Sequence, residues 1–334
     1  MRIVVDAMGS DNNPVPDVAG AVMAAHKLKD TIILVGDDTA IKTELAKHDT
    51  NGLSLEIVHA DQVITMEDKP SLIVREKKNS SMHVGMNLVK TGDADAFVTV
   101  GNTGAALGIA MLRNVGLGRI LGIKRPALGV IFPTPERPML IDNGANADCK
   151  PEYLLQFALM GSLYVERVLE INSPRVGLLS NGEEEGKGNI LIQEAIPLLE
   201  AADINYIGNI EPKDFMGGVA DVVVTDGFTG NIMMKTAEAV ASYMSKMIRV
   251  NIKSNPITAV GGLLARPAFD RVKKHLDPDE VGGAPLLGVN GVVIIGHGRS
   301  GAIAIMRAIE QAKHVAEKQV VDAIAAGIGR KGKS

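Results

Sequence analysis

Residues 94–104 read ADAFVTVGNTG, and residues 220–230 read ADVVVTDGFTG. The two stretches share Ala, Asp, Val, Thr, Gly, Thr and Gly at matching positions when the first is shifted by 126 residues. Each copy begins as an apolar run of strand length, turns on Gly-x-Thr-Gly and continues into a helical pattern. The repeat therefore predicts two strand–turn–helix units, the building element of an α/β fold.

The two glycine turns are candidate anion sites. A strand that turns on glycine into a helix exposes backbone N–H groups at the positive end of the helix dipole, where a phosphate or an oxyanion can bind. Glycine lets the backbone approach the anion, and a threonine hydroxyl adds a donor. Alternatively, glycine ends the strand and threonine caps the helix without a ligand; the repetition favours anion sites. The candidate substrate-binding residues are Gly101, Asn102, Thr103 and Gly104 in the first turn, and Gly227, Thr229 and Gly230 in the second.

The rest of the chain follows the same alternation of strand and helix. Hydrophobic residues make up 46% of the 334 residues and aromatic residues only 3%, so the core must consist of Ala, Val, Ile, Leu and Met. We predict a largely parallel sheet with helices on both faces, a three-layer αβα architecture, in a single α/β catalytic domain over residues 1–330. The loops after the strands should gather at their carboxyl ends, where such folds bind ligands. Strand candidates are residues 2–6, 31–35, 53–58, 95–100, 127–132, 138–142, 175–180, 204–207, 221–225 and 291–295.

Composition and motifs exclude several classes of function. The formal net charge of −4 argues against nucleic acid as a partner. A single cysteine, Cys149, and scattered histidines supply no disulfide and no metal cluster, so we expect no metal. The chain begins directly with a strand and contains no apolar run of membrane-spanning length, which predicts a cytoplasmic protein. GxxxxGK[ST] is missing and no GxGxxG opens a helix after a strand, which disfavours a P-loop kinase or a dehydrogenase.

Three polar side chains in the loops are candidates for chemistry. Lys187 lies in GEEEGKGN, where it can neutralise a bound phosphate or, alternatively, be solvated behind an acidic first turn. Asn231 ends DGFTGN, where its amide can donate to a carbonyl oxygen during acyl transfer or be an ordinary first-turn residue. His297 in GHGRSG is a candidate acid, base or phosphate donor, with a non-catalytic role as the alternative.

A basic and apolar segment occupies residues 246–276. Seven Lys and Arg residues face one acidic residue there, Asp270. An apolar tip flanked by cations can bind an anionic membrane surface. The same segment could instead dock an acidic protein, or form a helical hairpin in a dimer interface. We predict that residues 230–280 protrude from the domain as a helical segment. The apolar residues between the charges include Ile257, Val260, Leu263, Leu264 and Phe269.

At its loops the chain resembles the bacterial phosphate acyltransferases of phospholipid synthesis, the PlsX family. The matching stretches occur in order over nearly the whole chain, with the weakest agreement in residues 250–275. Three residues depart from the family pattern: Ser10 replaces a glycine, Ser180 an asparagine and Lys124 an acidic residue. The matching stretches are VDAMGSD at 5–11, KKNSSM at 77–82, VGNTGA at 100–105, RPAL at 125–128, DNGAN at 142–146, FALMGS at 157–162, GEEEGKG at 182–188 and DGFTGN at 226–231.

This resemblance implies an acyl-[acyl carrier protein]:phosphate acyltransferase that releases carrier thiol and an acyl phosphate. It implies a fold similar to phosphotransacetylase and isopropylmalate dehydrogenase, a homodimer, and peripheral association with an anionic membrane. The partners would be acyl carrier protein, inorganic phosphate and a downstream glycerol-3-phosphate acyltransferase. It assigns Lys187 to phosphate or the oxyanion and Asn231 to the thioester carbonyl, with no metal or nicotinamide cofactor.

The residues fit this chemistry, because phosphate is itself the nucleophile and a thiolate leaves without strong acid catalysis. Three alternatives stay open. The nearest is a phosphotransacetylase-like enzyme that uses an acyl-CoA thioester. A dehydrogenase on a related fold would bind nicotinamide. A non-enzymatic, membrane-bound phosphate-sensing scaffold would use the same basic tip without turnover.

Overall fold

The computed structural model describes residues 1–184, 186–276 and 282–331, with the side chains of 273–276 and 330–331 left undescribed. Within these residues, eleven strands form one mixed sheet in the order β3-β2-β1-β4-β11-β10-β5-β6-β9-β7-β8. The ten strands predicted from sequence are all present, and β10 is added to them. The strands are β1 (Arg2–Asp6), β2 (Thr31–Gly36), β3 (Leu55–His59), β4 (Ala96–Thr99), β5 (Ala127–Ile131), β6 (Met139–Ile141), β7 (Arg175–Leu179), β8 (Asn205–Ile210), β9 (Val222–Val224), β10 (Ala284–Leu287) and β11 (Val292–Ile295).

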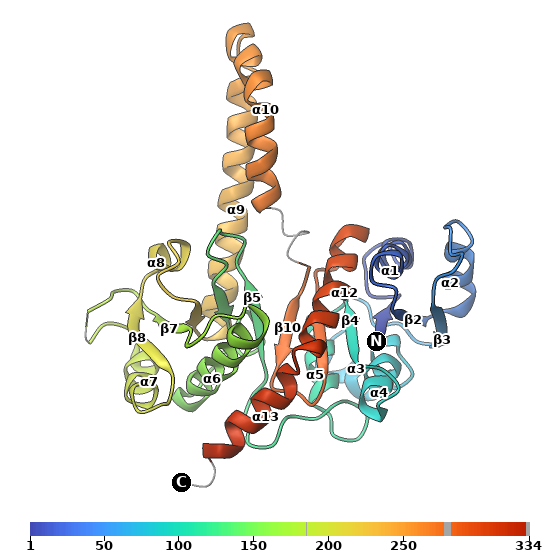
Figure 1. The fold of residues 1–334 in the computed structure, drawn as a ribbon, viewed down its shortest axis with the longest axis horizontal. Helices are drawn as coiled ribbons and strands as arrows, with labels where there is room; N and C mark the ends of the chain where they lie inside the picture. The colour runs from blue at the N-terminus through green and yellow to red at the C-terminus, as the bar shows by residue number, and fades with distance from the viewer. Residues whose placement is uncertain (185, 277–281, 332–334) are drawn as a thin grey trace.

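Helices cover both faces of the sheet, and the predicted three-layer αβα architecture is confirmed (Figure 1). On one face, α1, α2, α6, α7, α12 and α13 pack on a continuous apolar core. On the other face, α3, α4 and α5 build one apolar cluster and α8 and α9 a separate one. The helices are α1 (Val15–Leu28), α2 (Asp38–Leu45), α3 (Pro70–Glu76), α4 (Ser81–Thr91), α5 (Thr103–Met111), α6 (Pro151–Val168), α7 (Ile190–Glu200), α8 (Pro212–Met216), α9 (Gly227–Ile252), α10 (Pro256–Leu276), α12 (Ala302–Glu317) and α13 (Val320–Lys331).

The alternation of side chains along each strand builds these layers. In β9, Val222 and Val224 point into the continuous core, whereas Val223 points into the cluster under α9. The same period of two sorts the residues of β1, β2, β4, β6 and β11 between the two faces. Apolar side chains on both faces explain why these strands read as continuous apolar runs in the sequence.

Seven of the ten strand pairings are parallel, and the other three are antiparallel. The antiparallel pairings are consecutive, from β11 through β10 and β5 to β6. The strands β6, β7 and β9 therefore run opposite to β1, β4 and β11. The carboxyl ends of the strands, where the loops of interest were expected, therefore divide between two opposite edges of the sheet.

The two halves of the sheet are related by an approximate twofold axis that passes between β10 and β5. Counting outward from that boundary, β4 and β9 are each the third strand, and β1 and β7 each pair with it on the outer side. The sequence repeat of residues 94–104 and 220–230 occupies these equivalent positions. A rotation about an axis normal to the sheet preserves its faces, so α5 and α9 lie on the same face.

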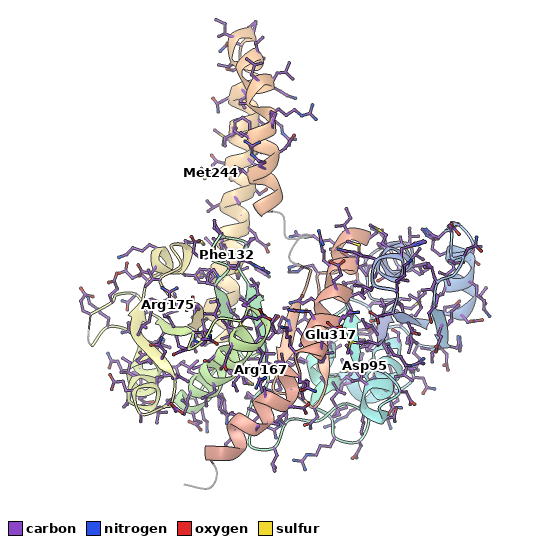
Figure 2. The ribbon with its side chains drawn as sticks, in the orientation of Figure 1. Asp95, Phe132, Arg167, Arg175, Met244 and Glu317 are labelled. Carbon is purple, nitrogen blue, oxygen red and sulfur yellow. The ribbon has the colours of Figure 1, made fainter. Side chains whose placement is uncertain are left out.

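Helices α9 and α10 lie side by side and project from the body of the protein as an antiparallel pair (Figure 1). Figure 2 places Phe132 near the foot of α9 and Met244 on its projecting part. These two helices fall within residues 227–276, and residues 277–281 lie outside the described part of the chain.

Candidate functional site

A cavity of about 650 Å³ separates α5 from α9 on the face where the apolar cover is divided. Its floor comes from β5, β10 and β11. The polar residues around it come from both halves of the molecule, some from loops and others from α5 and α9. Those polar lining residues are Asp11, Thr103, Asn143, Asn231, Lys235, Glu238, His297 and Arg299. The structure thus brings together four of the residues predicted from sequence: Thr103, Gly104, Asn231 and His297.

The first glycine turn is held by its asparagine. Asn102 caps α5, with its Oδ1 accepting a hydrogen bond from Ala105 N at 3.0 Å. Its Nδ2 donates to the carbonyl oxygens of Thr65 (3.2 Å) and Asp68 (3.1 Å), which fixes the loop before α3. Gly101 N donates to Thr99 Oγ1. The first N–H groups of α5, at Thr103 and Gly104, have no acceptor within the helix and lie at the cavity wall.

In the second turn the helix begins two positions earlier than in the first, when the two copies of the repeat are aligned. Asp226 caps α9 and accepts from both the N–H and the hydroxyl of Thr229, each at 2.8 Å. Gly227 N donates to Asn146 O, and Gly230 N donates to Asp226 O. These donors, predicted for a bound anion, are engaged within the protein. The aspartate, in place of Val100 in the first copy, explains the difference.

The glycines of this turn serve close packing instead. A Cβ at Gly230 would lie 2.1 Å from Asp142 O, and one at Gly227 would lie 2.7 Å from Asn146 O. Both glycines let α9 begin against the loop that follows β6. Because that loop lies on the cavity, the packing of Gly227 and Gly230 sets the position of Asn231.

Asp142 organises this loop. Its side chain is fully buried, and its two oxygens accept hydrogen bonds from the backbone N–H of Leu128, Ala145 and Asn146 and from Asn146 Nδ2. Burial raises the pKa of the Asp142 carboxyl to about 6. The carboxyl is fully used in holding the chain, so it is a structural group rather than a free ligand for a metal.

Two amide side chains meet the cavity at this end. An ideal Cβ at Gly144 would lie 3.6 Å from the side chain of Asn231, so the loop after β6 and the start of α9 touch here. Asn143 Oδ1 is buried, and among the described residues no hydrogen-bond partner reaches it. A buried polar atom without a partner is costly unless water or a ligand satisfies it. Asn143 was not singled out from the sequence.

The cationic side chains that line the cavity are Lys235 and Arg299, whereas the sequence pointed to Lys187. Lys235 lies four residues after Asn231 and therefore on the same side of α9. Arg299 reaches across from the loop after β11, and its Nη2 lies 3.5 Å from Glu238 Oε2 on α9. His297, predicted as a site residue, lines the cavity in the same loop and is exposed. Sequence reasoning missed Lys235, which has the spacing of a helical neighbour of Asn231.

Lys187 lies outside this cavity. It is exposed in the loop after β7, the strand that pairs in parallel with β9. This loop is held by Asn181, whose Oδ1 accepts from Gly188 N at 2.9 Å. Of the neighbouring glutamates, Glu183 forms an ion pair with Lys213, and Glu185 lies outside the described residues. Lys187 and Asn231 thus come from adjacent loops, but only Asn231 lines the cavity.

Cys149 has the properties of a structural thiol. Its Sγ lies 3.5 Å from Asn146 O, as donor to that carbonyl. Burial raises the pKa of the thiol to about 12, so that it remains protonated at neutral pH. This agrees with a reaction in which no cysteine acts as nucleophile.

The fold is that of the phosphotransacetylases. A phosphotransacetylase from Streptococcus pyogenes superposes with a TM-score of 0.59 at 19% identity, over 94% of each chain. A branched-chain phosphotransacylase from Enterococcus faecalis V583 gives a TM-score of 0.59 at 14% identity, over 95% of this chain and 99% of that one. At these identities the likeness establishes the fold alone.

The sequence itself identifies the family. Residues 1–323 match the family described as "Fatty acid synthesis protein". A phosphate acyltransferase from Elusimicrobium minutum is 49% identical over 97% of this chain and 95% of its own length. One from Geobacter sulfurreducens is 46% identical over 96% and 92%, respectively. The chain belongs to this family of bacterial phosphate acyltransferases, as its motifs predicted. Over the described residues, no helix combines the length and the hydropathy that a membrane span requires.

Proposed function

We propose that this protein transfers a fatty acyl group from acyl carrier protein to inorganic phosphate, giving an acyl phosphate for phospholipid synthesis. The observation that carries the proposal is the cavity between α5 and α9, where the amide of Asn231 and the cation of Lys235 lie on one side of a helix. Family membership supports acyl transfer to phosphate, since the relatives are named phosphate acyltransferases. The carrier as donor rests on the resemblance of the motifs.

In the proposed reaction a phosphate oxygen attacks the thioester carbonyl carbon. The carbonyl oxygen becomes an oxyanion, to which Asn231 donates a hydrogen bond. The C–S bond then breaks, and the carrier thiolate leaves and takes up a proton from water. Because a thiol has a pKa near 8.5, the thiolate leaves without a strong general acid.

The proposed phosphate site uses two lysines, Lys235 and Lys187. Lys235 on α9 lines the cavity, and Lys187 lies outside it in the loop after β7, the strand that pairs with β9. The N–H groups of Thr103 and Gly104 at the start of α5 supply further donors for an anion. A phosphate dianion between cationic side chains and a helix N-terminus is held by charge without a metal.

We further propose that the α9–α10 hairpin binds an anionic membrane surface and contributes to a homodimer interface. Its tip is apolar and exposed, with Ile257 85% and Leu264 78% accessible. The same hairpin carries the exposed basic residues Arg249, Lys253, Arg266 and Arg271. This combination supports peripheral binding to an anionic membrane, where a glycerol-3-phosphate acyltransferase would use the product. The long exposed flanks of the hairpin support a homodimer.

One experiment tests the reaction and separates the donors. The protein is mixed with inorganic phosphate and either palmitoyl carrier protein or palmitoyl-CoA, and products are followed by mass spectrometry. We expect acyl phosphate and free carrier thiol in equal amounts, with the carrier as the better donor. Turnover of the CoA thioester alone would favour a phosphotransacetylase-like enzyme. Phosphate binding without turnover of either donor would favour the non-enzymatic scaffold.

A further inference from the structure

We propose that the middle of the cavity is the binding slot for the acyl chain, and that Ala237 and Ala241 on α9 set the chain length that it accepts. The inference rests on the proposed function and assigns one of its substrates to a place. It concerns residues that lie away from the amide and cationic groups of the site.

The floor of the cavity is an apolar strip along β5. Leu128, Val130 and Phe132 alternate with residues that face the opposite core, so all three point to the cavity side of the sheet. Asn143 N donates to Leu128 O at 2.9 Å, which places the two amide side chains beside the start of the strip. At about 3.3 Å per residue, the strip from Leu128 to Phe132 extends roughly 13 Å away from them.

The walls of the slot are apolar on both sides. Leu107 on α5 belongs to the rim of one apolar cluster, and Met234 and Ala237 on α9 belong to the rim of the other. The slot is therefore an interruption in the hydrophobic cover of this face. Apolar surface that stays uncovered inside a cleft marks a site for an apolar ligand.

Helix α9 presents two edges to the cavity, one polar and one apolar. Asn231, Lys235 and Glu238 follow each other at spacings of four and three residues and form its polar edge. Met234, Ala237 and Ala241 follow at three and four residues and form the apolar edge. A thioester whose carbonyl meets Asn231 thus has its acyl chain directed along the apolar edge.

The size of the side chains on this edge determines how much chain fits. After Met234, the two lining residues that follow on the apolar edge are alanines. Their small side chains leave the space between α9 and β5 open. Larger side chains at these positions would fill the far part of the slot but leave the amide end unchanged.

The test is a chain-length profile of acyl-phosphate formation with carrier thioesters from butyryl to stearoyl. We expect Ala237→Leu and Ala241→Leu to retain turnover of the short donors and to lose at least about tenfold in kcat/KM for the long ones, because excluding a methylene from an apolar pocket costs about that much. Met234→Ala should shift the optimum to longer chains. The control is Ala239→Leu, which makes the same change on the same helix at an exposed position outside the slot.

Circular dichroism and gel filtration establish that each variant is folded, and leucine is a good helix former at all three alanine positions. Unchanged length profiles in the folded slot variants, with an active wild type, would overturn the slot and leave the proposed function intact. A profile that changes equally in Ala239→Leu would also overturn it. A wild type that forms no acyl phosphate from a donor of any length would instead overturn the proposed function itself.

Discussion

At the scale of single residues, the site depends on where the chain places one amide. Asn231 is the fifth residue of α9, not a first-turn residue, and the glycine before it allows the start of the helix to approach Asp142. We expect Asn231→Ala to lower turnover by roughly 10²–10³, the usual loss for one oxyanion donor, without a change in stability. Steady-state kinetics with carrier thioester measure this. Turnover within about twofold of wild type would remove Asn231 from the chemistry.

The two lysines make a separate prediction. We expect Lys235→Ala and Lys187→Ala to raise the KM for phosphate, with the larger effect at Lys235 because it lines the cavity. The KM for the acyl donor should change little in both variants, since the cations act on the anion. Lys246, which is exposed farther along α9, serves as the charge-matched control. An effect at Lys187 alone would move the phosphate to the loop after β7.

A buried carboxyl near the first loop links stability to pH. Asp17 is fully buried, and its Oδ2 accepts a hydrogen bond from Ser10 Oγ at 2.5 Å. No partner among the described residues reaches its Oδ1. Desolvation raises the pKa of Asp17 from 3.8 to about 7. The folded protein therefore keeps a proton there that the unfolded chain loses, and this contribution to stability falls as pH rises from about 4 to about 7.

Replacing the Asp17 carboxyl should remove its contribution to the pH dependence of the free energy of unfolding. We expect Asp17→Asn to raise the free energy of unfolding at pH 8 by on the order of 2–4 kcal/mol and to change it little at pH 4, where Asp17 is protonated. Urea unfolding at the two pH values measures the difference. Asp142, also buried with a raised pKa, stays in both proteins and cancels in the comparison. Equal destabilisation at both pH values would contradict a charged form that is costly to bury.

At the scale of elements, the α9–α10 hairpin separates surface binding from catalysis. Leu263 and Leu264 are 67% and 78% exposed on α10, whereas the cavity contacts α9 only as far as Ala241. We expect the double variant Leu263→Asp and Leu264→Asp to leave anionic vesicles in a sedimentation assay while acyl-phosphate formation in solution stays nearly unchanged. High salt should weaken binding of the wild type only in part, because the apolar contact is not screened.

The matched control for this prediction is Leu121→Asp, a change at a leucine that is 87% exposed in the loop before β5. That variant should sediment with vesicles as the wild type does. If the hairpin variant still binds vesicles, the tip is not the anchor. If it instead becomes monomeric or loses activity in solution, the hairpin belongs to a dimer interface or to a carrier docking surface. The side chains of Lys273 and Lys274, also expected to contribute charge, lie outside the described part of the chain.

Much of the element structure could be predicted from the sequence, because apolar runs and glycine turns mark it locally. Strand β10 was missed because its short sequence, APLL, contains Pro285, and proline is not typical of a strand interior. Near the C-terminus, α12 and α13 are separate helices because the chain breaks at Gln319, which has a φ of 52°. The repeated turns looked equivalent, yet Asp226 caps its helix two positions earlier than Asn102 does.

At the scale of the whole molecule, the spatial relation between the two copies of the repeat cannot be read from the sequence. The two copies lie at equivalent positions around a twofold axis, and three antiparallel pairings between them reverse their directions. Strand direction depends on pairings between distant segments, so no local pattern fixes it. In the folded protein Thr103 and Asn231, one from each copy, line the same cavity.

The central claim is that phosphate itself attacks the thioester in this cavity. The most direct measurement is the mass of the acyl phosphate formed from carrier thioester and phosphate labelled with ¹⁸O at every oxygen. We predict that the product keeps the whole label of the phosphate, because the attacking oxygen becomes the bridge to the acyl group and no bond to phosphorus breaks. Acyl phosphate that has lost one labelled oxygen, or free fatty acid in place of acyl phosphate, would contradict this account.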